Sequence, residues 1–517
     1  MAPTTDAPAT LTGLLARPEL THGDVPLLFV SRDGRHTTTL ARIRERAARL
    51  AAGLSELGVR PGAAVSVQFP LCEEAIVAQI AVLMVGGVLA PVVPVFGSRE
   101  LARLFSDARP EVHLTLPRWR KVDYLRQLDE VPPDVLPATV IVPGGGPGCL
   151  DWADVEDAEP LTDWAEVDED ATALVIYTSG STGEPKGVRH TRRTTLAEAY
   201  DVGYDLGVPE EELTFLYTSG AGHIAGFVYP LRVLARGMRC VVLDGWDAAL
   251  AARIVDAEKP TVMAGLPFHV VSMLDAADAE GLDLSSLLMA TIGGAPVSQA
   301  LVARADAAGV PVVKSYGLTE LPTAVLGDVN DPLEVRATYV GRPSGGNEVR
   351  IAAEDGTVVG PGQRGEIQLR GPELFAGYTN RSDEDTFTAD GWFPTGDIGE
   401  LTPDGLLLIV DRKKNIIIRG GENLSATEIE EIVGTHPAVA EAAVVGVPDA
   451  RYGERACAFV VLRDGATLTL AQLLEHFVAA GASKQKVPEY LQFVDALPRT
   501  ATGKLRKHDL TPPEPRS

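Results

Sequence analysis

The sequence of 517 residues has few cysteines and little sign of an oxidised or metal-binding framework. Four cysteines lie far apart, without a C-x-x-C pair or a Cys/His cluster at zinc spacing: Cys72, Cys149, Cys240 and Cys457. This scarcity excludes a disulfide scaffold and indicates reduced structural thiols, so we expect a cytoplasmic protein. The first ten residues lack both a basic patch and an apolar run, and we expect no secretory signal there.

The sequence also has fewer basic than acidic residues. Lys plus Arg total 46 against 71 Asp plus Glu, which leaves a net charge of −25. A general nucleic-acid binder needs a basic face, so this balance argues against nucleic acid as a partner. It leaves room for a local positive site for a phosphorylated ligand. Apolar residues make up 45% and charged residues 23%, an ordinary globular composition that excludes a disordered chain.

Uninterrupted apolar runs of membrane-spanning length are missing as well. Residues 75–96 are apolar apart from Gln79, but glycines and prolines between 86 and 94 interrupt the run. A buried helix over about 73–85, followed by a turn and a buried strand, fits this pattern better. We therefore expect no membrane span.

Along most of the chain, helical patterns alternate with short β-branched runs. An amphipathic pattern covers 40–57 and ends before Gly58, and a strand-like run follows at 63–69. Further strand-like runs cover residues 139–142, 173–177, 240–243, 261–264, 289–292 and 312–315. Such alternation predicts layers of helices and largely parallel strands, an α/β fold. The length suggests roughly three or four core-forming units.

The pattern changes toward the end of the chain. Between 341 and 410 helical patterns become scarce, and short strands with Gly and Pro turns indicate a small β unit. After it, a charged turn near 411–415 opens a new series of strands and helices, typical of a small α+β domain. We predict a large N-terminal domain of layered α/β subdomains plus the β unit over 1–411, and a small C-terminal domain over 412–517.

One segment concentrates the residue types that bind phosphate. Tyr177-Thr-Ser-Gly-Ser-Thr-Gly-Glu-Pro-Lys-Gly187 lies between a buried strand and a helical pattern from about Arg189. Glycines permit tight turns, while hydroxyls, backbone N–H groups and the Lys186 ammonium can surround phosphate oxygens. It is not a Walker loop, because Pro185 precedes the lysine and Gly187 follows it. A flexible surface loop is the alternative. The predicted phosphate ligands are Thr178, Ser179, Gly180, Ser181, Thr182, Gly183 and Lys186.

Six collinear segments resemble the superfamily of acyl- and aryl-CoA synthetases, peptide-synthetase adenylation domains and luciferases. Besides the loop above, they are Gly293-Gly-Ala-Pro296, Ser315-Tyr-Gly-Leu-Thr-Glu320, Gly391-Trp-Phe-Pro-Thr-Gly-Asp397, Asp411-Arg-Lys-Lys-Asn415 leading to Gly420-Gly-Glu-Asn423, and Pro498-Arg-Thr-Ala-Thr-Gly-Lys504. The resemblance spans nearly the whole chain. It implies an AMP-forming acyl-CoA synthetase that converts a carboxylic acid to acyl-CoA through an acyl-adenylate. ATP, Mg²⁺ and CoA, the last as a substrate, are the implied small molecules.

The resemblance implies an adenine site in the large domain. Gly293 and Gly294, followed by Ala295 and Pro296, would let the backbone lie flat against the base, and a plain turn is the alternative. Tyr316 would stack on the adenine, with Gly317 beside it, at the end of a strand where ligands of α/β proteins bind.

The neighbouring residues would serve phosphate and metal. The resemblance implies that Thr319 touches phosphate and that Glu320 helps to hold Mg²⁺, which prefers oxygen ligands and bridges phosphates. A solvated loop acid is the alternative for Glu320. Lys186 would add positive charge.

The resemblance also implies roles around the domain boundary. Asp397 would accept hydrogen bonds from the ribose hydroxyls, Arg412 would lie near ribose and phosphate, and Lys414 matches the hinge position. A charged, solvated linker is the alternative for Lys414. The C-terminal domain would then be mobile.

In that domain, Lys504 on the loop 498–504 would reach the active site and steady the charge on the α-phosphate, a transition-state role. A solvated lysine is the alternative. After domain rotation, Gly420, Gly421 and Glu422 would help to form the CoA tunnel.

The acyl pocket is expected around His223, Phe227, Gly317 and Thr323. His223 falls where the family often has an active-site histidine or aromatic residue, so we also assign it a catalytic role. The residues before it depart from the family, because 219–222 are small instead of proline and a large apolar residue. Together with Ala225 and Gly226 they hint at space for a bulky acyl group, and helix packing explains them equally well.

Three other functions stay open at this point. The acceptor could be the phosphopantetheine of a carrier protein, although no carrier domain follows Lys504 and free CoA is favoured. The enzyme could perform only one half-reaction, the thioesterification of a supplied acyl-adenylate. A nucleotide-binding regulator without turnover is the third, and the presence of Lys504 and Glu320 argues against it. The sequence names neither the acid nor the oligomeric state.

Overall fold

The computed structural model describes residues 10–16, 23–162, 164, 166–178, 186–200, 206–218, 220–380, 384–412, 415–419, 422–449, 453–480, 482, 486–500 and 505–512. The chain divides into two compact units, Met1–Val349 with Leu369–Phe393, and Arg350–Gln368 with Pro394–Ser517. The predicted mixed α/β architecture is confirmed. The small β unit falls largely in the second unit, and the domain boundary at residue 411 stays a prediction. The hinge near 411–415 stays a prediction.

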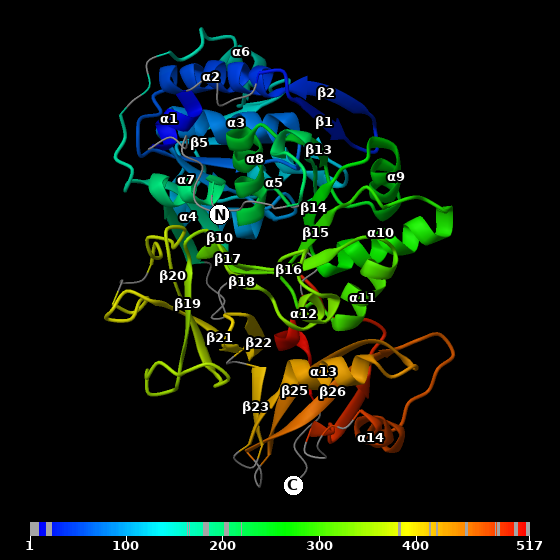
Figure 1. The fold of residues 1–517 in the computed structure, drawn as a ribbon. Coiled ribbons are helices and arrows are strands. Elements are labelled where there is room, and N and C mark those ends of the chain that lie inside the picture. Colours follow the sequence, from blue (N-terminus) through cyan, green and yellow to red (C-terminus); the bar gives the residue numbers. More distant parts are fainter. Residues whose placement is uncertain are drawn as a thin grey trace. The chain divides into compact units, whose positions relative to one another are not determined.

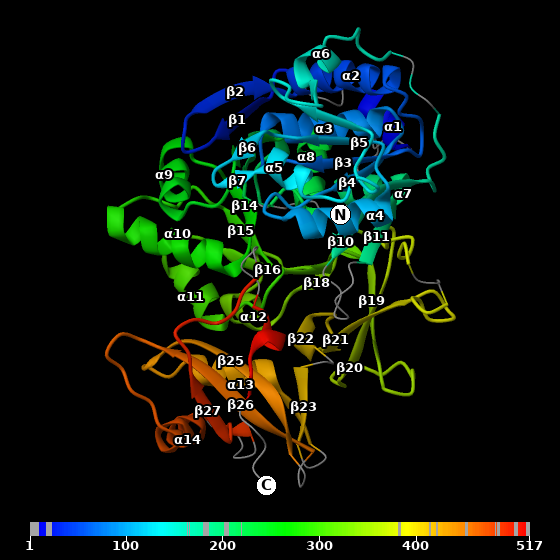
Figure 2. The ribbon, with the colours of Figure 1, turned by 180° about the vertical axis from the view of Figure 1, so that it is seen from behind.

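A nine-stranded sheet forms one half of the first unit (Figures 1 and 2). From edge to edge its strands are β18 (Arg342–Pro343), β17 (Leu321–Leu326), β16 (Val312–Leu318), β15 (Met289–Ile292), β14 (Val262–Gly265), β12 (Thr214–Tyr217), β13 (Arg239–Leu243), β1 (Pro26–Val30) and β2 (Arg35–Thr39). The strands from β1 to β16 pair in parallel, whereas β2, β17 and β18 run antiparallel to their neighbours. The parallel strands therefore bring their carboxyl ends to one edge of the sheet.

A seven-stranded sheet forms the other half. Its strands, in order, are β11 (Lys186–Thr191), β10 (Thr172–Thr178), β4 (Val88–Pro91), β3 (Ala64–Gln68), β5 (Val112–Thr115), β8 (Thr139–Val142) and β9 (Leu150–Asp151). All pair in parallel except β11, which is antiparallel to β10. A short hairpin of β6 (Arg118–Trp119) and β7 (Val122–Asp123) lies outside it.

Helices cover both sheets and fill the space between them. The nine-stranded sheet packs on its outer side against α9 (Ala248–Glu258), α10 (Pro267–Glu280), α11 (Gln299–Ala307) and α12 (Leu333–Thr338). The seven-stranded sheet packs against α4 (Ser98–Ala108) and α5 (Tyr124–Asp129). The shared core also takes in α1 (Leu11–Ala16), α2 (Leu40–Glu56), α3 (Glu73–Met84), α6 (Trp152–Glu156), α7 (Arg192–Tyr200) and α8 (Ile224–Arg236).

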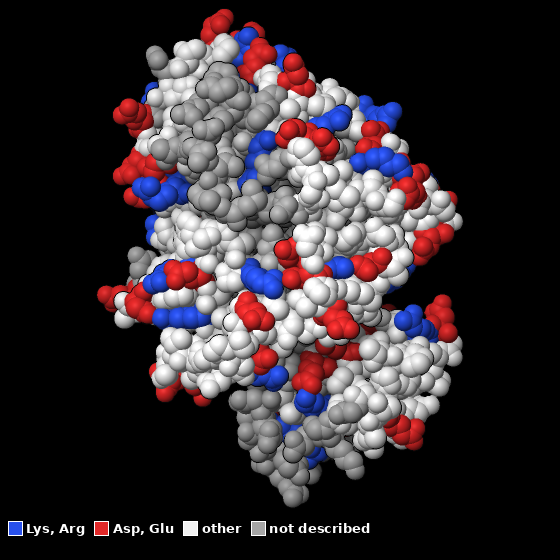
Figure 3. All heavy atoms as spheres, in the orientation of Figure 1, with Lys and Arg blue, Asp and Glu red and all other residues white. Residues whose placement is uncertain are grey.

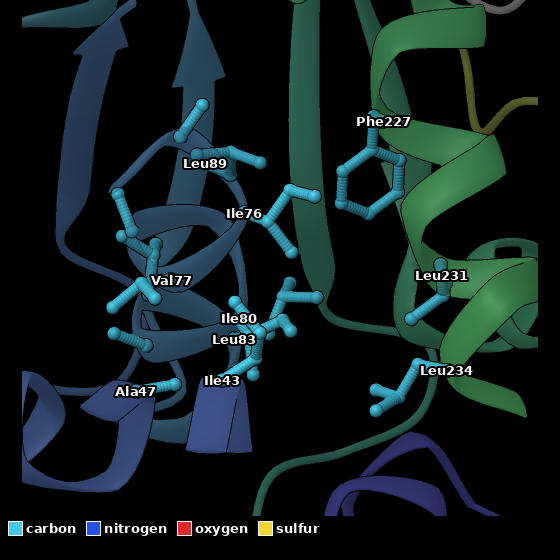
Figure 4. Packing of buried hydrophobic residues seen from close by; sticks show 14 of the residues in the cluster. Ile43, Ala47, Ile76, Val77, Ile80, Leu83, Leu89, Phe227, Leu231 and Leu234 are labelled. Carbon is cyan, nitrogen blue, oxygen red and sulfur yellow. The ribbon is translucent and has the colours of Figure 1, made fainter. Parts of the chain in front are cut away.

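Helices α3 and α8 form the centre of this core. Figure 4 shows their apolar side chains facing one another, with Ile76 of α3 opposite Phe227 of α8. The apolar run at residues 75–96 thus contains most of the buried helix α3, followed by strand β4. The amide nitrogen of its one polar exception is hydrogen-bonded, because Gln79 Nε2 donates to the carbonyl oxygen of Gly226 at 3.3 Å. Among the described residues, no helix is long and apolar enough to cross a membrane.

The second unit contains most of a four-stranded sheet and all of a five-stranded one. The first consists of β19 (Glu348–Ala352), β20 (Gly365–Arg370), β21 (Phe393–Leu401) and β22 (Leu407–Arg412). The second orders β24 (Glu422–Ser425), β23 (Ile416–Arg419), β26 (Gly453–Leu462) and β25 (Val439–Asp449), with β27 (Tyr490–Phe493) on β26. Helices α13 (Ala426–Gly434) and α14 (Leu470–Ala479) pack their apolar faces on this sheet.

Candidate active site

The predicted phosphate loop connects two antiparallel strands. Thr178 ends β10 and lies opposite Lys186, which begins β11. The helix expected from about Arg189 is therefore wrong at its start: β11 continues to Thr191 and α7 begins at Arg192, because Val188 is buried in the sheet against β10. The remaining phosphate-loop residues lie outside the described part of the chain: Ser179, Gly180, Ser181, Thr182 and Gly183.

The second motif lies on another hairpin. Strand β16 extends to Leu318 rather than ending at Ser315 as predicted, because it pairs with β17 and carries a bulge after Tyr316. Tyr316 and Gly317 therefore lie within the strand, and Thr319 and Glu320 form the tip. A Cβ atom on Gly317 would lie 1.9 Å from the carbonyl oxygen of Pro322, so the bulge requires glycine here.

A bridging segment, residues 373–379, joins the two hairpins. The backbone N–H groups of Ala376 and Thr379 donate to carbonyl oxygens of β11, each at 2.8 Å. The N–H of Phe375 donates to the carbonyl oxygen of Glu320, also at 2.8 Å. The bridging segment thus fixes the hairpin tip with Glu320 beside the strand that starts at Lys186.

Two side chains that the sequence analysis missed complete this group. The Tyr378 hydroxyl donates to Glu320 Oε1 at 2.5 Å, and Lys186 Nζ lies 5.4 Å from the centroid of the Tyr378 ring. His190 Nε2 donates to the carbonyl oxygen of Thr319 at 2.7 Å. Burial lowers the pKa of His190, which keeps the ring neutral with its proton on Nε2. In the sequence, the only local feature that could have indicated Tyr378 is the glycine directly before it, at 377.

The predicted adenine-binding residues follow β15. A Cβ atom on Gly293 would lie 2.5 Å from the carbonyl oxygen of Ser315, so β15 and β16 approach closely only with glycine here. Gly294 has φ +71°, a left-handed conformation that favours glycine. Ala295 and Pro296 are exposed. Gly293 thus allows β16 to pass beside the end of β15, and the role of both glycines at adenine stays a prediction.

The predicted acyl-pocket residues lie in three different environments. His223 precedes α8 and is exposed, whereas Phe227 is buried in the core between α8 and α3 (Figure 4). The Thr323 hydroxyl accepts a hydrogen bond from Arg232 at 3.0 Å and donates to Glu198 at 3.1 Å within a buried ion pair. The pocket itself stays a prediction.

The small residues around His223 have packing partners. A Cβ atom on Gly222 would lie 2.3 Å from the Cα atom of Val93, and one on Gly226 would lie 2.2 Å from the carbonyl oxygen of Gly220. Backbone packing therefore explains both glycines, and neither leaves space for a bulky acyl group.

The second unit holds the predicted ribose site. Asp397 and Arg412 face each other across β21 and β22, and Arg412 Nε lies 2.9 Å from Asp397 Oδ1. The carboxylate is 3% exposed, while Arg412 is exposed and keeps N–H groups at the surface. Glu422 begins β24, opposite Arg419. The remaining predicted residues of this unit lie outside the described residues: Lys414, Gly420, Gly421 and Lys504.

Comparison with known proteins identifies the chain. The family model "AMP-binding enzyme" matches residues 17–379, and "AMP-binding enzyme C-terminal domain" matches residues 428–504. The chain belongs to this family.

Its similar proteins include several ligases. Medium-chain fatty-acid–CoA ligase of Escherichia coli (strain K12) is 30% identical, over 91% of this chain and 84% of the relative. ATP-bound MatB from Rhodopseudomonas palustris has a TM-score of 0.85 at 26% identity, covering 96% of this chain and 98% of that one. The amide bond synthetase McbA from Marinactinospora thermotolerans has a TM-score of 0.84 at 27% identity, covering 97% and 99%.

These findings confirm the predicted activity at the level of the family. The chain is an adenylate-forming enzyme of the acyl-CoA synthetase type, with ATP, a carboxylic acid and CoA as its small molecules. The fold-class prediction is confirmed over nearly the whole chain. The residue assignments stay predictions.

Proposed function

We propose that a carboxylic acid is activated by ATP beside the two hairpins of the first unit, with Lys186 and Glu320 at the phosphates. One arrangement supports this most directly: Tyr378 contacts the side chains of both residues, which lie far apart in the sequence. In this first half-reaction a carboxylate oxygen of the acid attacks the α-phosphorus of ATP. The bond from that phosphorus to pyrophosphate breaks, and pyrophosphate leaves. Positioning and neutralisation of negative charge are the main catalytic contributions.

We assign Mg²⁺ to Glu320. The described residues contain no cluster of three or more side chains suited to bind a metal, so Glu320 would act without a dedicated cage. This donor set fits Mg²⁺, which proteins often hold through one or two carboxylates together with substrate phosphates. When bound, the ion would neutralise charge on the phosphate oxygens. Tyr378 occupies Oε1 of Glu320, and Oε2 would face the metal.

The remaining assignments concern the nucleotide and the second half-reaction. Asp397 and Arg412 would hold the ribose, and Lys504 would stabilise the charge on the α-phosphate. After a rotation about Lys414, the CoA sulfur would attack the acyl carbonyl carbon along a tunnel formed by 420–422. The bond from that carbon to the AMP oxygen would break, AMP would leave with the electron pair, and the thiol proton would be released.

The site of the acid and the cellular compartment complete the proposal. We keep His223, Phe227, Gly317 and Thr323 as the lining of the acyl pocket, with His223 at its exposed end. We place the reaction in the cytoplasm, because all four cysteines are unpaired and free thiols suit a reducing compartment.

The test uses Lys504→Ala in the full chain. Acid-dependent exchange of pyrophosphate into ATP is expected to fall at least 100-fold, because the lysine acts on the adenylation transition state. Thioester formation from a supplied acyl-adenylate is expected to stay within about threefold of the unsubstituted enzyme. Lys259→Ala, at an exposed lysine paired with Asp256 and Asp283, is the control and should leave both rates unchanged. Equal loss of both half-reactions would contradict the assignment.

The acceptor needs its own experiment. Purified protein, ATP and a panel of short, medium, aromatic and polycyclic acids are mixed with CoA, with a phosphopantetheine carrier protein, or with an amine. The amine arm is included because an amide bond synthetase shares this fold over nearly the whole chain. We expect AMP and acyl-CoA with CoA alone. AMP formation from a supplied acyl-adenylate, without any pyrophosphate release from ATP, would instead indicate an enzyme of one half-reaction.

A further inference from the structure

One buried tyrosine contacts both residues that we assign to the phosphates. Tyr378 is 7% exposed; its hydroxyl donates to Glu320 Oε1 at 2.5 Å, and its ring lies 5.4 Å from Lys186 Nζ. The backbone around it is fixed on two sides, by a β-bridge to Val188 and by the N–H of Phe375, which donates to the carbonyl oxygen of Glu320. The hydroxyl and the ring of Tyr378 therefore contact different candidate ligands of the nucleotide.

We propose that Tyr378 is a positioning residue that orients the Glu320 carboxylate so that Oε2 receives Mg²⁺ together with ATP. This rests on the proposed role of Glu320. The terminal torsion angle of a glutamate side chain has a broad distribution. Without a restraint, the carboxylate therefore rotates, and neither oxygen keeps a fixed position. A hydrogen bond to an ionised acceptor is stronger than one between neutral groups. The Tyr378 hydroxyl thus fixes one oxygen and leaves the other for the metal.

The ring makes a separate contribution. A lysine ammonium within about 6 Å of a tyrosine ring is attracted by the electrons of its face. Phenylalanine keeps this face and the edge-on ring contact with Phe375, which in turn packs against Phe387 and Phe393 in the same apolar cluster. The substitution Tyr378→Phe therefore removes the hydrogen bond to Glu320 and keeps the ring beside Lys186, whereas Tyr378→Leu removes both of these contacts.

The first measurement is the Mg²⁺ requirement of ATP binding without any acid, so that no turnover occurs. Calorimetric titrations of ATP at a series of Mg²⁺ concentrations give the Mg²⁺ concentration at which the increase in ATP affinity is half-maximal. Tyr378→Phe is expected to raise it about five- to tenfold. Thioester formation from a supplied acyl-adenylate is expected to stay unchanged, because neither Mg²⁺ nor pyrophosphate takes part in that step. If Tyr378 had a merely structural role, the substitution would impair both ATP binding and thioester formation. Tyr339→Phe, at a tyrosine outside the bridging segment, is the matched control.

The second measurement combines two substitutions. Glu320→Gln keeps an oxygen for the tyrosine hydroxyl but removes the charge that the metal needs. If Tyr378 acts through Glu320, adding Tyr378→Phe to Glu320→Gln has no further effect on the Mg²⁺ requirement. An unchanged Mg²⁺ requirement in Tyr378→Phe, or additive effects in the double variant, would overturn the proposal. Absence of acid-dependent pyrophosphate exchange in the unsubstituted enzyme would instead refute the proposed function itself.

Discussion

At the scale of single residues, the seven-stranded sheet buries polar side chains where apolar ones are usual. Ser66 Oγ lies 2.8 Å from His113 Nδ1 across β3 and β5, and both side chains are fully buried. The His113 ring packs edge-on against Phe105, and its Nε2 atom has no partner among the described residues. Burial lowers the pKa of His113 to about 3, so the folded protein keeps this ring neutral over the whole physiological range.

This histidine makes folding sensitive to acid. An unfolded histidine takes up a proton near pH 6.5, whereas His113 in the folded state does so only near pH 3. The unfolded state therefore binds more protons between these values, and stability falls as the pH falls. From pH 7 to pH 5 the contribution of one such group is about 2 kcal/mol.

We expect His113→Leu to lose correspondingly less stability over that range. Urea unfolding followed by tryptophan fluorescence at pH 7, 6 and 5 measures the difference. The other buried histidines with lowered pKa values, His190 and His269, contribute equally to both proteins. Parallel pH dependences of the two proteins would contradict the prediction.

At the scale of elements, the entry into α8 depends on a close backbone contact. Gly222 lies against the chain that leaves β4, where a Cβ atom would lie 2.3 Å from both the N and Cα atoms of Val93. Helix α8 then runs to Arg236 and ends at Gly237, whose φ of +64° provides a left-handed cap. The position of His223 is therefore set by how closely the preceding loop approaches β4.

Gly222→Ala is expected to destabilise the first unit by about 1–3 kcal/mol, the usual cost of overpacking, because rigid backbone cannot yield to the new methyl group. The midpoint of thermal unfolding should fall by several degrees. Gly220→Ala is the control from the same loop, since its Cβ atom would meet only His223 Cδ2 at an ordinary 3.5 Å. Equal midpoints for the two variants would argue against the packing explanation.

The elements also show where prediction from sequence succeeded and where it failed. The periodic patterns predicted the strand at 289–292 and the buried helix near 73–85, because burial on all sides leaves a clear apolar signal. Strand β11 was missed, since Lys186, Arg189 and the residues between them carry no such period and the strand depends on its pairing with β10.

The candidate site shows the same limit. Its motifs predicted Lys186 and Glu320 from chemistry and resemblance. Tyr378 and His190 were not predicted, because each is connected to the site by a tertiary contact with the β16–β17 hairpin and not by any local sequence pattern.

At the scale of the whole molecule, the sequence carries an excess of 25 negative charges. On the face shown in Figure 3, acidic and basic side chains are interspersed over much of the described surface. Many acids are paired, as in the bridges from Arg32 to Asp247 and from Arg253 to Glu280. The proposed nucleotide contacts need only local cations, so the net charge and the chemistry of the site are compatible.

In the second unit, a buried carboxylate connects the end of the four-stranded sheet to the start of α13. Asp411, at the end of β22, accepts hydrogen bonds from Ser425 Oγ at 2.7 Å and from Thr427 N at 3.0 Å. Ser425 also caps α13, so Asp411 holds the start of that helix against β22. The residues on either side of the predicted hinge at Lys414 are thereby connected.

Removing this carboxylate should loosen the connection. We expect Asp411→Ala to increase amide hydrogen exchange of 422–427 by about 10- to 100-fold, since hydrogen bonds to a charged group contribute roughly 1.5–3 kcal/mol. Asp404→Ala, at an exposed turn of the same four-stranded sheet, should leave that segment unchanged. Unaltered exchange in both variants would show that Asp411 does not hold the helix.

The position of β1 has a consequence for synthesis on the ribosome. Leu27 pairs with Cys240 of β13, a partner that follows about 210 residues later. At 5–20 residues per second, β1 and the attached β2 wait roughly 10–40 s before the strand that receives them has been translated. During that time β1 has β2 as its partner on one side, while its other edge lacks β13. Nascent chains that end before residue 239 should therefore depend on chaperones, and the β1–β2 hairpin can join the rest of the nine-stranded sheet only when nearly half of the molecule has been made.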